Sequence, residues 1–506
     1  MAKNSSINSL NYTIRIIIAL FITPYIISKL GMELFGLWAL LGIIPSYAFL
    51  SDLGISRSVV KFVAEYIGRR DEKGLYEIVN TAFILYLILG LAGFFLFFYL
   101  RETIIKILNV PSNLHNVAIF VYVALIAIFY LNFIFSIFKA ILNGLQRLYI
   151  TSSIATFSNL IFALGAFYVL EKGYKLKGLV IVNGISVIIT ISLYYIFSRR
   201  YLPNCRFNVK LFKKEKVKEI FKFGVHVEAS YIFRLFYDPI NKILLSNYAS
   251  LELVGVYEIA LKILRWSQIL FRKSIEPLLP AGSRYYQERK KEEFVRFYLF
   301  SIRYITLMFL PVCLIIFFFS ESFIFLWVGK GFMLSVFMLQ LLIFAYFLEI
   351  MATPSFILIQ SMNLPKYSMF ATLIRGILNA GLGLILIRFF SYKGLIFSIF
   401  ISIIFSSLFI IRIFHKKVSL NIKDFMTFLS LRFLYIFILS ASFMFILANL
   451  YKPNNLIILI LMAILFLLFY MFLILKLKFF RSEDVEIIKR ILPHKFHNFI
   501  DRFIFV

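Results

Sequence analysis

The chain contains repeated apolar runs of about twenty residues, and this feature restricts its fold more than any other. A helix needs roughly 20 residues to cross the hydrocarbon core of a membrane, and stretches such as ILILMAILFLLFYMFLIL (458–475) approach that length. These runs are apolar on every side and show no alternation, which excludes the strands of a membrane barrel. Hydrophobic residues make up 61% of the 506 residues, above the share of about one half in soluble domains. The sequence therefore predicts an all-α integral membrane protein.

Hydropathy predicts about 14 transmembrane helices. The first six cover residues 10–28, 36–53, 80–100, 117–142, 149–170 and 179–198. The next six cover residues 220–247, 253–279, 299–319, 332–358, 367–387 and 394–411. The last two cover residues 433–450 and 456–475.

Lysine and arginine are distributed unevenly between the two sets of connections. With the N-terminus placed inside, the inner connections hold 36 of the 54 basic residues and the outer connections hold 10. Because cytoplasmic loops retain an excess of Lys and Arg, we expect a cytoplasmic-membrane protein with both termini in the cytoplasm. The net charge of +29 is then a topology signal and an attraction to anionic membrane lipids, and no nucleic-acid partner is expected.

The second half of the chain repeats the first at an offset of 219 residues. The segment LFGLW (34–38) falls on LVGVY (253–257). The same offset pairs Tyr66 with Tyr285, Arg70 with Arg289 and Arg15 with Arg234. Six helices per copy, an even number, give both copies the same orientation, so the repeat is parallel. We expect two six-helix bundles related by a pseudo-two-fold axis along the membrane normal, with a substrate site between them.

The repeat and the basic connections also predict the domain boundaries. An N-terminal six-helix bundle covers 1–200, and a basic cytoplasmic linker covers 201–222. A C-terminal six-helix bundle covers 223–415. Helices 13 and 14 fall outside the repeat as an appended pair in 416–480, followed by a basic cytoplasmic tail in 481–506.

Charged residues also occur inside the predicted helices. The basic ones are Arg15, Lys139, Arg234, Lys242, Lys262, Arg265, Arg303 and Arg375, and the acidic ones are Glu228, Asp238, Glu258, Glu276 and Glu349. A charge at the bilayer centre costs about 2.5–3.5 kcal/mol, so such residues should face a wet interior. Lys139, Lys242, Arg303 and Glu276 lie near helix ends, where we interpret them as snorkelling to the interface.

Two adjacent predicted helices each carry three charged residues on one face. One face holds Arg234, Asp238 and Lys242 at i, i+4 and i+8, and the other holds Glu258, Lys262 and Arg265 at i, i+4 and i+7. Two such faces indicate a lined cavity. The alternative is static pairing, of Asp238 with Arg234 or Lys242 and of Glu258 with Lys262.

Three arginines favour the binding of an anion. Arg15, Arg265 and Arg375 have no acidic partner on their own helix. The planar guanidinium group grips phosphate or carboxylate at two points and keeps its charge when buried. A membrane-embedded carboxylate could carry a coupling proton or sodium ion, and the candidates are Asp238, Glu258 and Glu349.

Motifs for cofactors and metals are missing from the sequence. The two cysteines, Cys205 and Cys313, are far apart, and the five histidines form no paired motif. Gly-rich phosphate loops are also missing, so ATP-driven transport by this chain alone is not expected. We expect no cofactor and no metal.

With these features the sequence resembles the polysaccharide flippases of the O-antigen type, in the superfamily that also holds multidrug exporters and lipid II flippases. The resemblance rests on LFGLW (34–38) followed by SDLGI (51–55), the hairpin 65–74, VGVY (254–257) and Asp238. It implies two bundles around a central cavity, which move a polyprenyl-phosphate-linked oligosaccharide to the outer leaflet by alternating access. The cavity of such flippases is cationic. The resemblance therefore implies that Arg15, Arg234, Lys262, Arg265 and Arg375 bind substrate.

Two other transport functions stay open. A multidrug antiporter of the same fold would need an acidic or aromatic cavity for organic cations, whereas a lipid II type flippase would also be cationic. An enzyme is not expected, because the sequence has neither a large outer loop nor a catalytic carboxylate motif. We expect a monomer that acts on lipid-linked oligosaccharide, with polysaccharide-assembly proteins as further partners.

Overall fold

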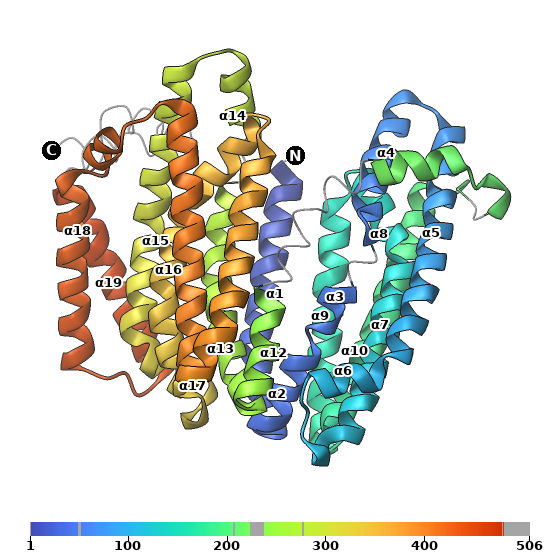
Figure 1. Ribbon diagram of the computed structural model, residues 1–506, viewed down its shortest axis with the longest axis horizontal. Helices are drawn as coiled ribbons and strands as arrows, with labels where there is room; N and C mark the ends of the chain where they lie inside the picture. Colours follow the sequence, from blue (N-terminus) through green and yellow to red (C-terminus); the bar gives the residue numbers. More distant parts are fainter. Residues whose placement is uncertain are drawn as a thin grey trace. The chain divides into compact units, whose positions relative to one another are not determined.

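The computed structural model describes residues 2–48, 52–205, 208–222, 237–275, 278–477 and 479. Every regular element among these residues is a helix, which confirms the predicted all-α fold. Contacts divide the chain into two compact units. The first contains Met1–Glu258 and Asn379–Leu395, and the second contains Ile259–Leu378 and Ile396–Val506. Figure 1 labels the helices of both units.

The first unit begins with the helices of the N-terminal half. They are α1 (Ala2–Leu30), α2 (Met32–Leu41), α3 (Ile44–Ala48), α4 (Ile55–Arg69), α5 (Glu72–Tyr99), α6 (Arg101–Ile107), η2 (Ser112–Leu114), α7 (His115–Ile134), α8 (Ser136–Gly144), α9 (Leu148–Glu171), α10 (Lys175–Tyr201) and η3 (Val209–Leu211). Helix α10 packs against α7, α8 and α9, and α1 packs along α9. Figure 1 shows α5 and α7 side by side in this unit.

The first unit also takes in parts of the second sequence repeat. These are α12 (Asp238–Tyr248), the start of α13 (Leu251–Ser274) and residues 379–395 of α17 (Pro365–Val418). Helix α12 contacts α2.

The second unit holds the rest of α13 and α17 together with α14 (Leu278–Gln287), α15 (Lys291–Val328), η5 (Lys330–Phe332), α16 (Leu334–Ser361), α18 (Ile422–Leu450) and α19 (Leu456–Lys476). Helix α15 packs along α16, and α18 and α19 cover another side of α15, as Figure 1 shows. Leu314, Ile436 and Phe466 share a buried cluster at that contact. Tyr470 Oη donates a hydrogen bond to the Leu307 carbonyl oxygen at 2.7 Å. The helix pair outside the repeat is therefore anchored on α15.

The described residues contain ten helical stretches that are long and apolar enough to cross a membrane. One of them, Pro365–Val418, contains two predicted helices, since Ser391 breaks its helical backbone with φ 51°. The predicted helix 36–53 is shorter than expected: the chain turns at Gly42 and Ile43, between α2 and α3. Pro45 explains the restart there, because proline is tolerated in the first turn of a helix but not inside one. The count of 14 stays a prediction.

The internal repeat is visible in the way two matched helices end. Arg70 ends α4 with φ 56°, and Arg289 follows α14 with φ 57°. The next amide in each half closes the same kind of turn: Asp71 N donates to Tyr66 O at 3.0 Å, and Lys290 N donates to Tyr285 O at 3.2 Å. Such bonds satisfy the last carbonyl groups of a helix. Residues matched by sequence thus have the same local geometry.

Candidate functional site

Helix α13 carries a charged face in the part of the chain where the predicted transmembrane helices hold the most charge. Lys262, Arg265, Gln268 and Arg272 follow one another at intervals of three or four residues, which places them on one side of the helix. We call these four residues the cationic stripe. All four belong to the second unit.

In the first part of α13 the charged face is also the partly exposed face, whereas Gln268 further along is only 4% exposed. From Val254 to Leu264, Glu258 and Lys262 alone are not buried, and Arg265 and Arg272 are partly exposed as well. The charges interrupt the apolar sequence of α13, which is not among the ten described stretches apolar enough to cross a membrane. The charged side chains of Glu258, Lys262, Arg265 and Arg272 are therefore not fully covered by the rest of the described chain.

Glu349 of α16 joins the stripe to α17. Its Oε1 atom lies 2.7 Å from Arg272 Nη2 and 2.8 Å from Arg375 Nη1. Arg272 also donates to Gln268 Oε1 at 3.1 Å. The side chains of Glu349 and Arg375 are 18% and 13% exposed, whereas that of Arg272 is 41% exposed. One carboxylate therefore orients two guanidinium groups, of which one stays accessible.

The structure thus brings together two residues that the sequence placed in different roles. Arg375 was a substrate-binding candidate and Glu349 an ion-coupling candidate, and they form one ion pair between α16 and α17. Sequence reasoning missed Arg272, because it was counted with the basic residues of the inner connection although it falls inside the predicted helix 253–279. The continued spacing from Arg265 through Gln268 to Arg272 is the signal that could have found it.

The cluster around the stripe is rich in positive charge. It contains four cationic side chains, Lys262, Arg265, Arg272 and Arg375, and one carboxylate, Glu349. Lys262 and Arg265 also interact with other groups of the protein. Within the second unit, this set of side chains has the composition needed to hold a group with several negative charges, such as a pyrophosphate.

The ion-coupling candidate Glu258 lies in the first unit and binds Lys242 of α12. Lys242 Nζ is 2.7 Å from Glu258 Oε2 and donates to the Ala39 carbonyl oxygen at 3.0 Å. Lys242 is only 8% exposed. The snorkelling interpretation was wrong for Lys242, since an ion pair and a backbone carbonyl satisfy it inside the protein.

Arg303 is a second correction to the snorkelling interpretation. It is 4% exposed, donates a hydrogen bond to the Phe479 carbonyl oxygen, and lies 4.2 Å from the centre of the Phe479 ring. Lys139, in contrast, is exposed. Glu228 and Glu276 lie outside the described residues.

Asp238, the third ion-coupling candidate, begins α12 and is partly buried. It interacts with other groups of the protein. One turn further along, Asn241 receives a hydrogen bond of 2.8 Å from Asn379 and donates one of 3.1 Å to Tyr257. A network of uncharged polar groups therefore accompanies the Lys242–Glu258 pair in the first unit.

Arg15 lies on α1 in the first unit and is partly buried. Its guanidinium group is 5.2 Å from the centre of the Tyr12 ring, and it interacts electrostatically with Lys139 of α8. Two cations therefore lie close enough to repel each other. Arg234, the residue matched to Arg15 by the repeat, lies outside the described residues.

The repeated glycines of LFGLW and LVGVY meet each other in the first unit. A Cβ atom added to Gly36 would overlap the carbonyl group of Leu251. A Cβ atom added to Gly255 would lie 3.1 Å from Phe35 Cδ1 and 3.3 Å from Gly36 N. The missing side chains let α2 and the start of α13 approach backbone to backbone.

Solved membrane transporters share this fold. A lipid II flippase in an inward closed conformation matches 92% of this chain and 97% of its own, with a TM-score of 0.71 and 17% identity. An inward-facing multidrug transporter matches 81% of this chain and 98% of its own, with a TM-score of 0.69 and 16% identity. The fold and the apolar helices thus define a multi-pass membrane protein with the fold of the multidrug and flippase superfamily.

The family follows from the sequence comparison. The model of the polysaccharide biosynthesis protein family matches residues 1–286, more than half of the chain, and the chain belongs to this family. A candidate O-antigen transporter of Shigella flexneri is 24% identical over 375 residues, which cover 72% of this chain and 85% of the relative. The membrane protein EpsK of Bacillus subtilis is 28% identical over 232 residues, or 44% of each chain. The resemblance found in the sequence is confirmed.

Proposed function

We propose that the protein is a flippase that moves a polyprenyl-phosphate-linked oligosaccharide from the inner to the outer leaflet by alternating access. The observation that carries this proposal is the cationic stripe of α13 with Arg375. Arginine and lysine side chains at this depth are costly unless they bind something, and phosphate is the group that a planar guanidinium fork fits best. The family and the O-antigen relative support the same substrate class.

The proposed path places the phosphate groups on the cations while the lipid tail stays in the bilayer. Lys262, Arg265 and Arg375 would hold the pyrophosphate on the side of the second unit. Within the first unit, Arg15 is the proposed phosphate-binding residue, where a bound anion would relieve its repulsion with Lys139. Arg234 takes the corresponding role in the second repeat by its sequence match alone.

The carboxylate of Glu349 would compete with the substrate for the same guanidinium groups. In the structure it holds Arg272 and Arg375. A phosphate that displaced the carboxylate would leave Glu349 free to take up a proton or a sodium ion. Asp238 and Glu258 are the other carboxylates proposed for ion coupling.

Alternating access requires one contact that forms in one state and breaks in the other. We infer that the packing of Gly36 against Leu251 and of Gly255 against Phe35 is such a contact. From the positive-inside pattern we propose that this contact lies on the outer side of a cytoplasmic membrane, with both termini in the cytoplasm. A monomer suffices for this cycle, and polysaccharide-assembly proteins are its expected partners.

The proposal can be tested in proteoliposomes that contain the purified protein. A fluorescent polyprenyl-pyrophosphate oligosaccharide is added in one leaflet, and its appearance in the other is followed beside an efflux assay with an organic cation. We expect transfer of the lipid-linked oligosaccharide and no cation efflux. Cation efflux alone would identify a multidrug antiporter, and transfer of lipid II in place of the oligosaccharide would identify a lipid II type flippase.

A further inference from the structure

A cavity of about 420 Å³ lies in the second unit where the end of α14, the start of α15 and the ends of α16 and α17 meet. Its volume falls in the range of small-molecule sites, roughly 300–1,000 Å³. The cavity shares no lining residue with the cationic stripe. It is therefore a separate feature from the proposed substrate path.

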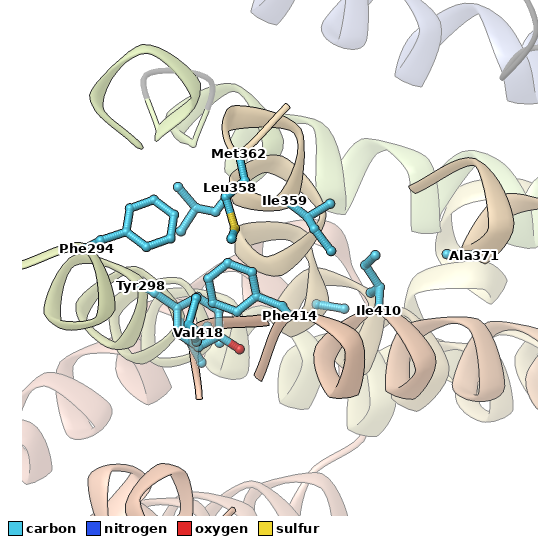
Figure 2. Close-up of a cluster of buried hydrophobic side chains, with 11 residues drawn as sticks. Phe294, Tyr298, Leu358, Ile359, Met362, Ala371, Ile410, Phe414 and Val418 are labelled. Carbon is cyan, nitrogen blue, oxygen red and sulfur yellow. The ribbon is translucent and has the colours of Figure 1, made fainter. Parts of the chain in front are cut away.

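The floor of the cavity is apolar and firmly packed. Phe294, Met362 and Val418 line it, and they are only 3%, 8% and 5% exposed. Figure 2 shows these three side chains in one cluster with Phe414 and Tyr298. A hydrogen bond of 2.7 Å between Tyr298 Oη and His415 Nε2 holds this tyrosine in position. Such a floor can hold the carbon chain of a ligand without rearranging.

The rim of the cavity is cationic and exposed. Its basic side chains are Arg289, Lys290, Lys291 and Lys417. Lys290 forms a salt bridge with Glu288, with 3.0 Å between Lys290 Nζ and Glu288 Oε2. Among the described residues, Arg289 and Lys291 form no salt bridge, and the ammonium group of Lys417 lies 5.3 Å from the centre of the Tyr367 ring.

Two acidic residues, Glu288 and Glu293, pair with the rim at Lys290, and Glu288 also pairs with Arg284. Glu288 Oε1 receives a hydrogen bond of 2.8 Å from Arg284, and Oε2 binds Lys290. The hydrogen bonds from Arg284 and then from Lys290 hold the pKa of Glu288 below its ordinary value. The remaining rim cations therefore keep their charge available for a ligand.

The sequence repeat provides a comparison for this cavity. In the first unit Tyr66, the match of Tyr285, is contacted by the linker helix 214–222. Lys216 donates a hydrogen bond to Tyr66 Oη, and Ser58 Oγ donates to the Ile220 carbonyl oxygen at 2.8 Å. The chain itself thus covers the matched position in the first half. In the second half Tyr285 lines the cavity instead.

We propose that this cavity binds the phosphate group of an anionic membrane lipid, with the rim cations on the phosphate and the lipid carbon chain on the apolar floor. The connections that form it, around Arg289, Lys366 and Lys417, are all on the predicted cytoplasmic side. Anionic lipids concentrate in that leaflet, and basic pockets between transmembrane helices at this depth bind their headgroups. Exposed Tyr286 supplies the amphipathic aromatic group typical of the interface.

Lipid binding to the full-length protein in detergent tests the proposal without measuring transport. Short-chain phosphatidylglycerol is titrated beside phosphatidylcholine, and bound lipid is counted by native mass spectrometry. The test variant replaces Arg289, Lys291 and Lys417 with Gln. The matched control replaces Lys213, Lys214 and Lys218 with Gln, which removes the same charge from exposed positions of the linker.

We expect phosphatidylglycerol to bind the unmodified protein at least tenfold more tightly than phosphatidylcholine. The test variant should lose this preference while the control keeps it. Thermal unfolding without added lipid checks that the test variant is folded, and only its stabilisation by phosphatidylglycerol should disappear. Retained preference in the test variant, or an equal loss in the control, would overturn the proposal.

A competition with glycerol 3-phosphate separates two sources of the same phosphate chemistry. If it fails to displace phosphatidylglycerol, the ligand is the membrane lipid, as proposed. Displacement at equal concentrations would mean that the carbon chain contributes nothing, and it would overturn the lipid assignment in favour of a soluble phosphate ester. Either outcome is independent of the proposed flippase function.

Discussion

Replacing Gly36 with Ala should open the contact between α2 and α13, whereas the same change at Gly255 should nearly preserve it. The added methyl group at position 36 overlaps the backbone carbonyl of Leu251, which cannot move aside without shifting α13. At position 255 the nearest atoms are Phe35 Cδ1 at 3.1 Å and Gly36 N at 3.3 Å, so a shift of a few tenths of an ångström in both is enough. The two repeat-matched positions therefore differ in what they tolerate.

The expected magnitude follows from the cost of overpacking. Extra carbon atoms in a well-packed region cost about 1–3 kcal/mol, which shifts a two-state equilibrium about 5- to 150-fold. For Gly36→Ala we expect the equilibrium between the closed and the open contact to shift toward the open one within this range. For Gly255→Ala the same conversion gives a shift of less than about fivefold. Helix propensity alone predicts that Gly36→Ala stabilises the protein, because Ala stabilises a helix interior by about 1 kcal/mol over Gly.

A cysteine at Leu251 reports on this contact. Leu251 is 5% exposed, so a Leu251→Cys thiol can react with a membrane-impermeant maleimide only when the contact opens. Cys205 and Cys313 are first replaced with Ser. The labelling rate should rise at least fivefold in Gly36→Ala and change little in Gly255→Ala. Equal rates in both variants, or no change in Gly36→Ala, would refute the argument from backbone packing.

Two other predictions use the same structure. Glu349→Gln should destabilise the protein by about 2 kcal/mol in chemical unfolding, less than the 3–5 kcal/mol for a fully buried pair because Arg272 is 41% exposed. The control Glu321→Gln, whose partner Lys452 is 75% exposed, should cost under about 1 kcal/mol. Equal losses of stability in the two variants would contradict the role of Glu349 in holding Arg272 and Arg375. Burial raises the pKa of the Cys205 thiol to about 11 from 9.0, so at pH 8 its thiolate should be about 100-fold scarcer than that of an ordinary cysteine. Iodoacetamide should therefore label Cys205 slowly until SDS unfolds the protein. Fast labelling of the folded protein would contradict this prediction.

The repeat and the membrane character could be predicted because they depend on local patterns. LFGLW and LVGVY align without gaps, and the matched Arg70 and Arg289 have φ values of 56° and 57°. A helix end is determined by the few residues around it. The repeat therefore paired two positions that have the same local geometry, without any knowledge of tertiary packing.

Partners from distant helices could not be predicted in this way. Glu349 is 77 residues from Arg272 and 26 from Arg375 in the chain, and nothing on one helix specifies the face of another. Lys242 has a nearer partner on the next helix, Glu258, but its second partner is the carbonyl group of Ala39. Its position near a helix end suggested snorkelling, whereas tertiary packing buries it.

The flipping rate of a stripe variant tests whether the cations of α13 carry the phosphate groups. Lys262→Gln combined with Arg265→Gln is compared in proteoliposomes with Lys213→Gln combined with Lys214→Gln, which removes the same charge from the exposed linker. Transfer of the fluorescent polyprenyl-pyrophosphate oligosaccharide should fall at least tenfold in the stripe variant and stay unchanged in the linker variant. Equal rates in the two variants, with both inserted in equal amounts, would contradict the proposed role of the stripe.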